Sequence, residues 1–231
     1  MRSIWRTLPP ALQRDMLALA GALAVIGMSF GAIAVASGLD WWMPSALSVL
    51  VFAGGSQFMV VGVVAAGGGI VAAVLGALVL NARHLPFGLA IGDIIGRGKL
   101  ARLVGSHLMI DESVAFAMAQ KDPARARAVF WFLGTTAFAV WNLGTIVGVL
   151  AGQGIADPKA FGLDAAFPAA LLALVLPALK DTRTRNAALL GAAIALATTP
   201  FLPAGLPVLL ALGGLVVLIP APRQTAEEVS V

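Results

Sequence analysis

The stretch Met16–Gly38, MLALAGALAVIGMSFGAIAVASG, contains no charged side chain. An α-helix needs about 20 apolar residues to cross the hydrocarbon core of a bilayer, and this stretch is long enough. The apolar region of a cleaved signal peptide is shorter, roughly 7 to 15 residues. The sequence therefore predicts a retained first membrane span over about residues 16–36.

The composition of the whole chain extends this prediction to the rest of the molecule. Of 231 residues, 60% are hydrophobic and only 11% are charged, whereas soluble domains average about 25% charged residues. The net charge of +4 comes from basic residues that cluster between apolar runs, as topology signals do, so we discount a nucleic-acid surface. The absence of cysteine excludes disulfides and thiolate chemistry. We expect an all-α polytopic membrane protein in the lipid bilayer.

Three regions follow from the distribution of charge and proline. Residues 1–15 are basic and interrupted by proline, so we expect a cytoplasmic leader. Residues 16–222 are expected to form a single transmembrane helical domain, and residues 223–231 a polar C-terminal tail. The basic leader predicts a multi-pass protein of the bacterial inner membrane with its N-terminus in the cytoplasm.

The number of spans depends on one segment. The charge-free stretches Trp41–Ala82 and 186–222 are each long enough for two spans. Residues 128–156 hold one helix, and Ala165–Leu179 forms one short apolar segment. Leu103–Gln120 is less apolar, and it either crosses the membrane or lies on its surface as an amphipathic helix. The first alternative gives eight transmembrane helices and the second gives seven. Placing most basic clusters in the cytoplasm favours eight.

A glycine pair interrupts the second predicted span. Gly54 and Gly55 are followed by the hydroxyl of Ser56 and the amide of Gln57. Glycine-interrupted helices in transporters free backbone groups that bind a substrate inside a cavity. Close helix packing, with Gln57 bonded to a neighbouring helix, is an equally good interpretation at this stage.

The third predicted span, about residues 70–90, carries Asn81, Arg83 and His84, with Pro86 close behind. We expect the proline to bend the helix and open carbonyls beside the polar groups. Ionisable groups at membrane depth are costly and usually face an interior pathway. Arg83 offers a planar fork that fits a carboxylate. Alternatively, Arg83 extends to the membrane surface as a topology signal.

His107, Asp111 and Glu112 form the second polar group. His107 and Asp111 are four residues apart, which places them on one face if the segment is a single helix. That arrangement predicts either a proton relay or an ion pair with Arg83. Both histidines of the chain, His84 and His107, fall in this region, and imidazole titrates near physiological pH.

A short repeat indicates internal duplication. Residues 38–48 (GLDWWMPSALS) and 162–172 (GLDAAFPAALL) share six of eleven positions. In both copies an acid, Asp40 or Asp164, precedes a predicted helix, so we expect these two residues to cap helix N-termini. Repeats around a site near the midplane are typical of secondary transporters.

An ordered series of motifs resembles the AzlC family, from about Gly21 to Arg185. The motifs are Phe30-Gly31, Phe52-Ala53-Gly54-Gly55-Ser56-Gln57-Phe58, Asn81-Ala82-Arg83-His84, Asp111-Glu112-Ser113, Gly144-Thr145, and Gly162-Leu163-Asp164 with Phe167-Pro168. The resemblance implies the large subunit of a branched-chain amino acid exporter. It also implies a small membrane partner of the AzlD type.

The physical interpretation of the residues adds candidate roles to this resemblance. We expect export of a branched-chain or similar apolar amino acid, driven by the proton gradient, without a cofactor or metal. The candidate substrate-binding residues are Asn81, Arg83, Gly54, Gly55, Ser56 and Gln57. The candidates for proton coupling or an ion pair are His84, His107, Asp111 and Glu112. Alternatives are an ion or small-solute channel, a scaffolding subunit, and a membrane enzyme. The sequence contains no dense ligand motif such as H-E-x-x-H that would favour the enzyme.

Overall fold

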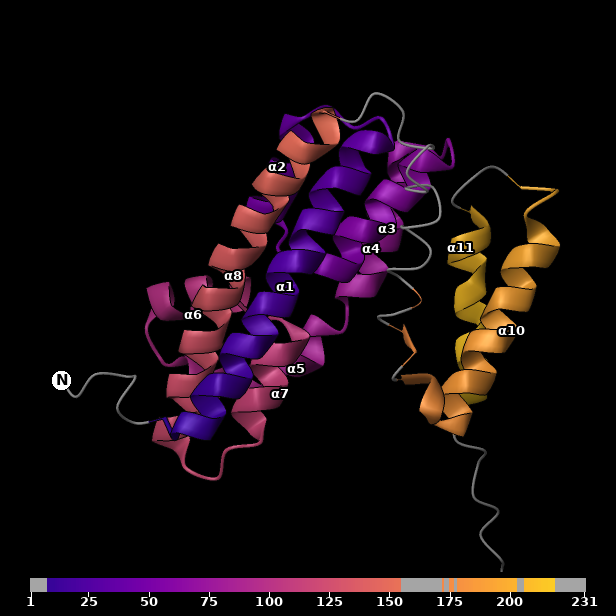
Figure 1. Cartoon of the computed structure of the whole chain (residues 1–231). Helices are drawn as coiled ribbons and strands as arrows, with labels where there is room; N and C mark the ends of the chain where they lie inside the picture. Colours follow the sequence, from indigo (N-terminus) through magenta and orange to yellow (C-terminus); the bar gives the residue numbers. More distant parts are fainter. Residues whose placement is uncertain (1–7, 155–171, 173–174, 177, 203–205, 219–231) are drawn as a thin grey trace, which may run out of the picture. The chain divides into compact units, whose positions relative to one another are not determined.

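The computed structural model describes residues 8–154, 172, 175–176, 178–202 and 206–218 (Figure 1). The chain divides into two compact units, Met1–Leu171 and Leu172–Val231. Every regular element in the described ranges is helical. Many large apolar side chains are exposed, among them Leu89 (88%) and Ile70 (80%). An aqueous surface rarely carries so many, and a lipid-facing surface does.

Two long helices form the centre of the first unit. Helix α1 is Pro10–Ala36 and helix α8 is Pro123–Gln153. They lie side by side and run in the same direction (Figure 1), since Gly27 lies against Trp141 while Gly31 lies against Thr145. Helix α1 begins at Pro10, so residues 10–15 of the predicted leader are helical. Helix α8 agrees with the single helix predicted for residues 128–156.

Glycines at four-residue spacing explain the close contact of α1 with α8. A Cβ atom on Gly27 would lie 2.7 Å from the Trp141 carbonyl oxygen, and one on Gly144 or Gly148 would overlap the α1 backbone. Inside a bilayer no hydrophobic force joins two helices, so small residues that bring backbones into contact provide the packing energy.

Helices α2 (Trp42–Leu50) and α3 (Gly54–Ala65) are separated by a break at residues 51–53. Helix α2 runs antiparallel to α8, because Ser48 meets Thr145 and Phe52 meets Phe138. The break confirms the glycine-interrupted helix predicted from the sequence. The stretch Trp41–Ala82, which is predicted to hold two spans, contains three helices of 9 to 12 residues.

Helices α4 (Ile70–Asn81) and α5 (His84–Ile95) form one apolar path that bends by 44°. The bend predicted here is present, but it falls at Ala82–Arg83 and not at Pro86. Pro86 lies in the first turn of α5, where a helix has no backbone bond for it to remove. Helix α3 runs antiparallel to α4, since Ser56 meets Ala77 and Gly76 meets Met59.

The end of α5 is held at the beginning of α8. Arg127 donates from Nε to the Ile94 carbonyl at 2.9 Å, and the Trp131 indole N–H donates to the Ile95 carbonyl at 3.3 Å. The path α4–α5 therefore runs antiparallel to α8. It follows that α3 runs parallel to α8 while α2 runs antiparallel, so the chain turns back on itself at residues 51–53.

Helices α6 (Lys99–His107) and α7 (Asp111–Met118) form a second pair that turns back. The segment starts beside the end of α5 and returns to the start of α8, and these two ends are in contact. Leu103–Gln120 therefore does not form the single continuous helix predicted from the sequence. The prediction that His107 and Asp111 share a helix face is also wrong, because His107 ends α6 and Asp111 begins α7.

Within the described ranges, α1 and α8 are long and apolar enough to cross a membrane, and the bent pair α4–α5 is a third candidate. The seven or eight spans predicted from the sequence remain a prediction. The number of spans is difficult to predict for a physical reason. A helix that crosses the membrane and a pair of helices that turns back need the same apolar composition, and only the positions of the two ends of the segment distinguish them.

The second unit contains η3 (Ala178–Lys180), α10 (Thr182–Thr198), α11 (Leu206–Leu210) and η4 (Ala211–Leu218). Helix α10 packs against η4 through Gly191 and Gly214. The Asp181 side chain caps α10, and the hydrogen bond from the Thr184 backbone N–H holds the pKa of this exposed carboxyl below its usual value.

The predicted caps and repeat have different outcomes. Helix α2 begins after Trp41 and no side chain caps it, so the capping role predicted for Asp40 is wrong. The second copy of the repeat, including Asp164, and the tail from residue 223 lie outside the described residues.

Candidate functional site

Three chain breaks meet in the first unit. They are residues 51–53 between α2 and α3, 82–83 between α4 and α5, and 108–110 between α6 and α7. Arg83 at the second break contacts both the beginning of α3 and the beginning of α7. Breaks expose backbone donors and acceptors that a continuous helix uses internally, so this is where polar groups can face a solute.

Arg83 is the centre of this arrangement. Its Nε donates to Asp111 Oδ1 at 3.0 Å, the one ion pair in the described part of the chain, and its Nη1 donates to the Leu80 carbonyl at 2.8 Å. Its Nη2 lies 3.6 Å from the position that a Cβ atom on Gly55 would occupy. The side chains of Arg83 and Asp111 are 30% and 50% exposed, so a solute can reach both.

The N-terminus of α3 adds positive potential at the same place. The helix begins at Gly54 and no side chain caps its first turn. Uncapped backbone N–H groups and the helix dipole favour an anion. Because Gly55 has no side chain, the guanidinium of Arg83 comes within contact of this first turn. Two sources of positive potential therefore converge.

Asn81 and Ser56 join α4 to α3 beside this helix end. The Ser56 hydroxyl donates to Asn81 Oδ1 and also lies 3.3 Å from the Ala77 carbonyl oxygen. Ser56 is fully buried, while Asn81 is half-buried. These two candidate residues fix the first turn of α3 on α4, and the Ser56 hydroxyl and Asn81 Oδ1 are already used for that contact.

Asp111 and Glu112 occupy the first turn of α7. An acid is stabilised there by the helix dipole. Ser113 holds this helix start, since its hydroxyl accepts from the Ile110 N–H and donates to the Ile110 carbonyl, both at 3.0 Å. Asp111 faces Arg83, and Glu112 is half-buried on the neighbouring side of the turn.

The two histidines lie in different environments. His84 Nδ1 is 3.0 Å from the Asn81 carbonyl oxygen, and its ring meets the edge of Phe87. The His107 ring packs against the rings of Phe52 and Phe138, at centroid distances of 6.3 and 5.6 Å, and these two rings also contact each other. The structure thus connects His107 to the break before α3 and not to Asp111, so the relay based on a shared helix face has no geometric basis.

A model of the AzlC family, described as AzlC protein, matches residues 18–155, more than half of the chain. The chain belongs to the AzlC family. The match includes all three breaks. The resemblance inferred from the motifs is therefore confirmed, and AzlC proteins are the branched-chain amino acid exporter component.

Curated relatives of this AzlC protein are named as membrane proteins. Two proteins of Helicobacter pylori, each named "Uncharacterized membrane protein", are 25% and 24% identical over 173 residues. In each case the alignment covers 74% of this chain and 75% of the relative. No solved structure matches. Family and relatives together establish a membrane protein with a transport-related role.

Gln57 and Trp141 contain buried polar atoms without partners in this AzlC protein. Gln57 is fully buried, and neither atom of its amide makes a hydrogen bond to a described residue. The same holds for the indole nitrogen of Trp141. Within the described ranges, the bond from Gln57 to a neighbouring helix that the packing interpretation requires is not present. Buried polar groups are nearly always hydrogen-bonded, so this pair needs an explanation.

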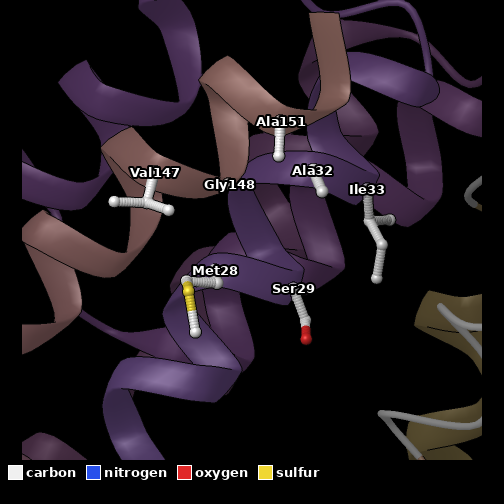
Figure 2. A pocket seen from close by; sticks show the side chains of 7 residues that line it. All are labelled: Met28, Ser29, Ala32, Ile33, Val147, Gly148 and Ala151. Carbon is white, nitrogen blue, oxygen red and sulfur yellow. The ribbon is translucent and has the colours of Figure 1, made fainter. Parts of the chain in front are cut away.

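An apolar groove of about 270 Å³ lies elsewhere, along the seam of α1 and α8 (Figure 2). Ser29 supplies its only side-chain hydroxyl, and no charged group lines it. A charged solute finds no partner there, so the polar site of the AzlC protein is at the breaks. The groove is lined by Met28, Ser29, Ala32, Ile33, Val147, Gly148 and Ala151.

Two residues near the site were not predicted from the sequence. Trp141 lies against Gly54, and a Cβ on that glycine would be 2.9 Å from the indole Cη2. Phe52 has a φ of 39°, which non-glycine residues rarely adopt. The glycine pair signals a close approach at this point. No sequence pattern shows which distant side chain approaches, so Trp141 becomes visible only in the fold.

Proposed function

We propose that this AzlC protein exports branched-chain or similar apolar amino acids, driven by the proton gradient, together with a small AzlD-type membrane subunit. We place it in the bacterial inner membrane with the N-terminus in the cytoplasm. The single observation that carries the proposal is the contact of Arg83 with the uncapped beginning of α3, opposite an acid.

The substrate carboxylate binds between Arg83 and the first turn of α3. The guanidinium provides a planar fork for a carboxylate, and the α3 N-terminus provides free backbone donors. In the unliganded arrangement Asp111 occupies one side of that fork. A zwitterion can replace this ion pair with two new ones, because its carboxylate pairs with Arg83 while its ammonium group pairs with Asp111.

This exchange couples proton entry to substrate exit, which is the direction that export needs. A proton and the substrate ammonium group compete for the same carboxylate of Asp111, so the two bind alternately. Alternate binding means that proton entry drives substrate exit. If protonated Asp111 merely released Arg83 to the substrate, proton and substrate would bind together, and the gradient would drive uptake instead.

The test uses vesicles that contain the full-length chain with its partner subunit. Wild-type vesicles are expected to release leucine when a proton gradient is applied. Arg83→Ala is expected to abolish this release, because the carboxylate loses its charged partner, which costs about 3 kcal/mol or more for a charge-assisted contact. Arg97→Ala is the matched control, since Arg97 is exposed and lies outside the site.

A second measurement names the solute class. Thermal unfolding of the purified complex is followed across a panel of amino acids, since a ligand that binds only the folded state raises the melting temperature. Stabilisation by leucine, isoleucine and valine supports the proposal. Leucine release unchanged in Arg83→Ala, at equal expression, would remove Arg83 from the mechanism.

A further inference from the structure

Gln57 on α3 and Trp141 on α8 carry three buried polar atoms without hydrogen-bond partners among the described residues. Gln57 is 0% exposed and Trp141 is 5% exposed. The unpaired atoms are the amide nitrogen and oxygen of Gln57 and the indole nitrogen of Trp141, none of which bonds to a residue in the described ranges. A folded protein retains such groups where they have something to bind, since leaving them unpaired is costly.

The Trp141 side chain, from α8, packs on the face of α3 that carries Gly54 and Phe58. Gly54 faces the Trp141 ring, and Phe58, four residues on, also meets that ring at a centroid distance of 6.5 Å. Gln57, three residues after Gly54, lies on the same face. Side chains of a helix lean toward its N-terminus, so the amide extends toward the uncapped end of α3. Arg83 reaches the same end from the Gly55 side.

The unpaired atoms define the chemistry of a ligand. Gln57 Nε2 and Trp141 Nε1 donate, and Gln57 Oε1 accepts. A hydroxyl group fits this set, because it accepts from the donors and donates to the amide oxygen. The rings of Phe30 and Phe58, which contact each other and Trp141, provide an apolar wall for a methyl group.

We propose that Gln57 and Trp141 form a side-chain subsite beside the carboxylate site, and that through it this protein carries threonine, the hydroxyl isostere of valine. The proposal rests on the proposed function, because it requires the substrate carboxylate to bind at Arg83. A purely aliphatic site would have no use for three polar atoms, whereas a site for a small branched side chain with one hydroxyl uses all of them.

Access to this subsite requires α3 to move relative to Trp141, since both side chains are enclosed. The chain permits this at the break before α3. Phe52 holds a strained φ of 39° there, and residues 51–53 separate two short helices. Because the strained residue lies directly before the first turn that carries the site, substrate contacts at that turn can shift the equilibrium at the break.

The experiment compares threonine with valine in vesicles that contain the full-length chain and its partner subunit. We expect wild-type protein to release both amino acids, at rates within about tenfold of each other. Gln57→Met keeps the length of the side chain and removes its hydrogen bonds, and Trp141→Phe keeps a ring and removes the N–H. Each is expected to lower the threonine-to-valine ratio roughly three- to tenfold, the effect of one lost hydrogen bond.

Matched controls come from the same chain. Gln120→Met and Trp131→Phe make the same chemical changes at residues whose side chains bond to the Phe116 and Ile95 carbonyls. Both are expected to leave the threonine-to-valine ratio unchanged. Because both rates are measured within one preparation, a variant that yields less folded protein lowers both rates equally and leaves the threonine-to-valine ratio unchanged.

The outcomes separate this inference from the proposed function. Valine and leucine release with rejection of threonine would overturn the subsite and leave the proposed function intact. A lowered melting temperature of Gln57→Met with an unchanged ratio would also overturn it, because the amide would then hold only a structural water. Absence of release for every amino acid would overturn the proposed function and the subsite together.

Discussion

At the residue scale, the proposed site depends on Arg83 and Asp111. The sequence indicated both residues, because charged groups in an apolar chain are conspicuous. It also indicated an ion pair between them, and Arg83 Nε and Asp111 Oδ1 are in contact. It did not indicate that Arg83 would reach α3 through Gly55, because that contact depends on how the chain turns at residues 51–53.

Asp111→Asn tests the competition between proton and substrate. Asparagine accepts a hydrogen bond from an ammonium group but does not titrate between pH 5 and 8. We expect leucine exchange across the vesicle membrane to persist, with affinity lowered roughly tenfold by loss of the charge. Release driven by a proton gradient is expected to disappear.

The measurement follows radiolabelled leucine with and without an imposed pH gradient. Asp93→Asn is the control, because only the backbone carbonyl of Asp93 makes a contact, with Arg127. Gradient-driven release that survives in Asp111→Asn would show that the coupling proton binds elsewhere.

At the scale of elements, the breaks in the helices carry the site. Composition predicted helices throughout the described ranges, and glycine predicted the interruption before α3. The sequence could not distinguish a helix that crosses from a pair that turns back, as Leu103–Gln120 shows. Both structures bury the same apolar residues, and the decisive contact, Arg127 with Ile94, joins residues far apart in the chain.

Gly31→Ala tests the packing of α1 on α8. The added methyl group would overlap the Thr145 carbonyl, which belongs to the backbone and cannot rotate away. We expect destabilisation by about 1–3 kcal/mol, the usual cost of overpacking. Gly21→Ala on the same helix is the control, since a Cβ there meets nothing within 4 Å. It is expected to stabilise by roughly 0.5–1 kcal/mol through helix propensity.

Thermal unfolding of both variants in detergent measures the difference. The sign of the change in melting temperature is informative, because both variants replace a glycine with alanine on the same helix. Equal melting temperatures for Gly31→Ala and Gly21→Ala would mean that α1 and α8 do not pack through their glycines.

At the scale of the whole molecule, the described part of the first unit explains the distribution of charge. Because α6 and α7 return to their starting side, the basic residues at 97–102 and 121–127 lie at the end where α1 and α8 begin. The eight-span prediction required one basic link outside the cytoplasm. The turn between α6 and α7 places the two basic groups at the same end of these helices, which is the arrangement that the positive-inside rule favours.

Cysteine labelling checks this topology without interference, since the chain has no cysteine of its own. Gly98→Cys and Lys121→Cys are expected to react with an impermeant reagent from the cytoplasmic side. Ala66→Cys, in the turn between α3 and α4, is expected to react from the opposite side. All three positions are exposed in the structure.

Labelling of Gly98→Cys and Lys121→Cys from opposite sides would show that Leu103–Gln120 crosses the membrane after all. The second unit makes no contribution to this test, because the three positions lie in the first.

The glycine contacts between α1 and α8 distinguish these two helices from the shorter helices of this unit. Two backbones that touch directly have no side chains between them to rearrange, so we expect this pair to stay rigid during transport. We expect the movement to occur in the shorter helices around it, which are joined by breaks and not by continuous hydrogen-bonded turns. Mutations along the glycine seam should therefore reduce the yield of protein, whereas mutations at the breaks should change the speed of turnover.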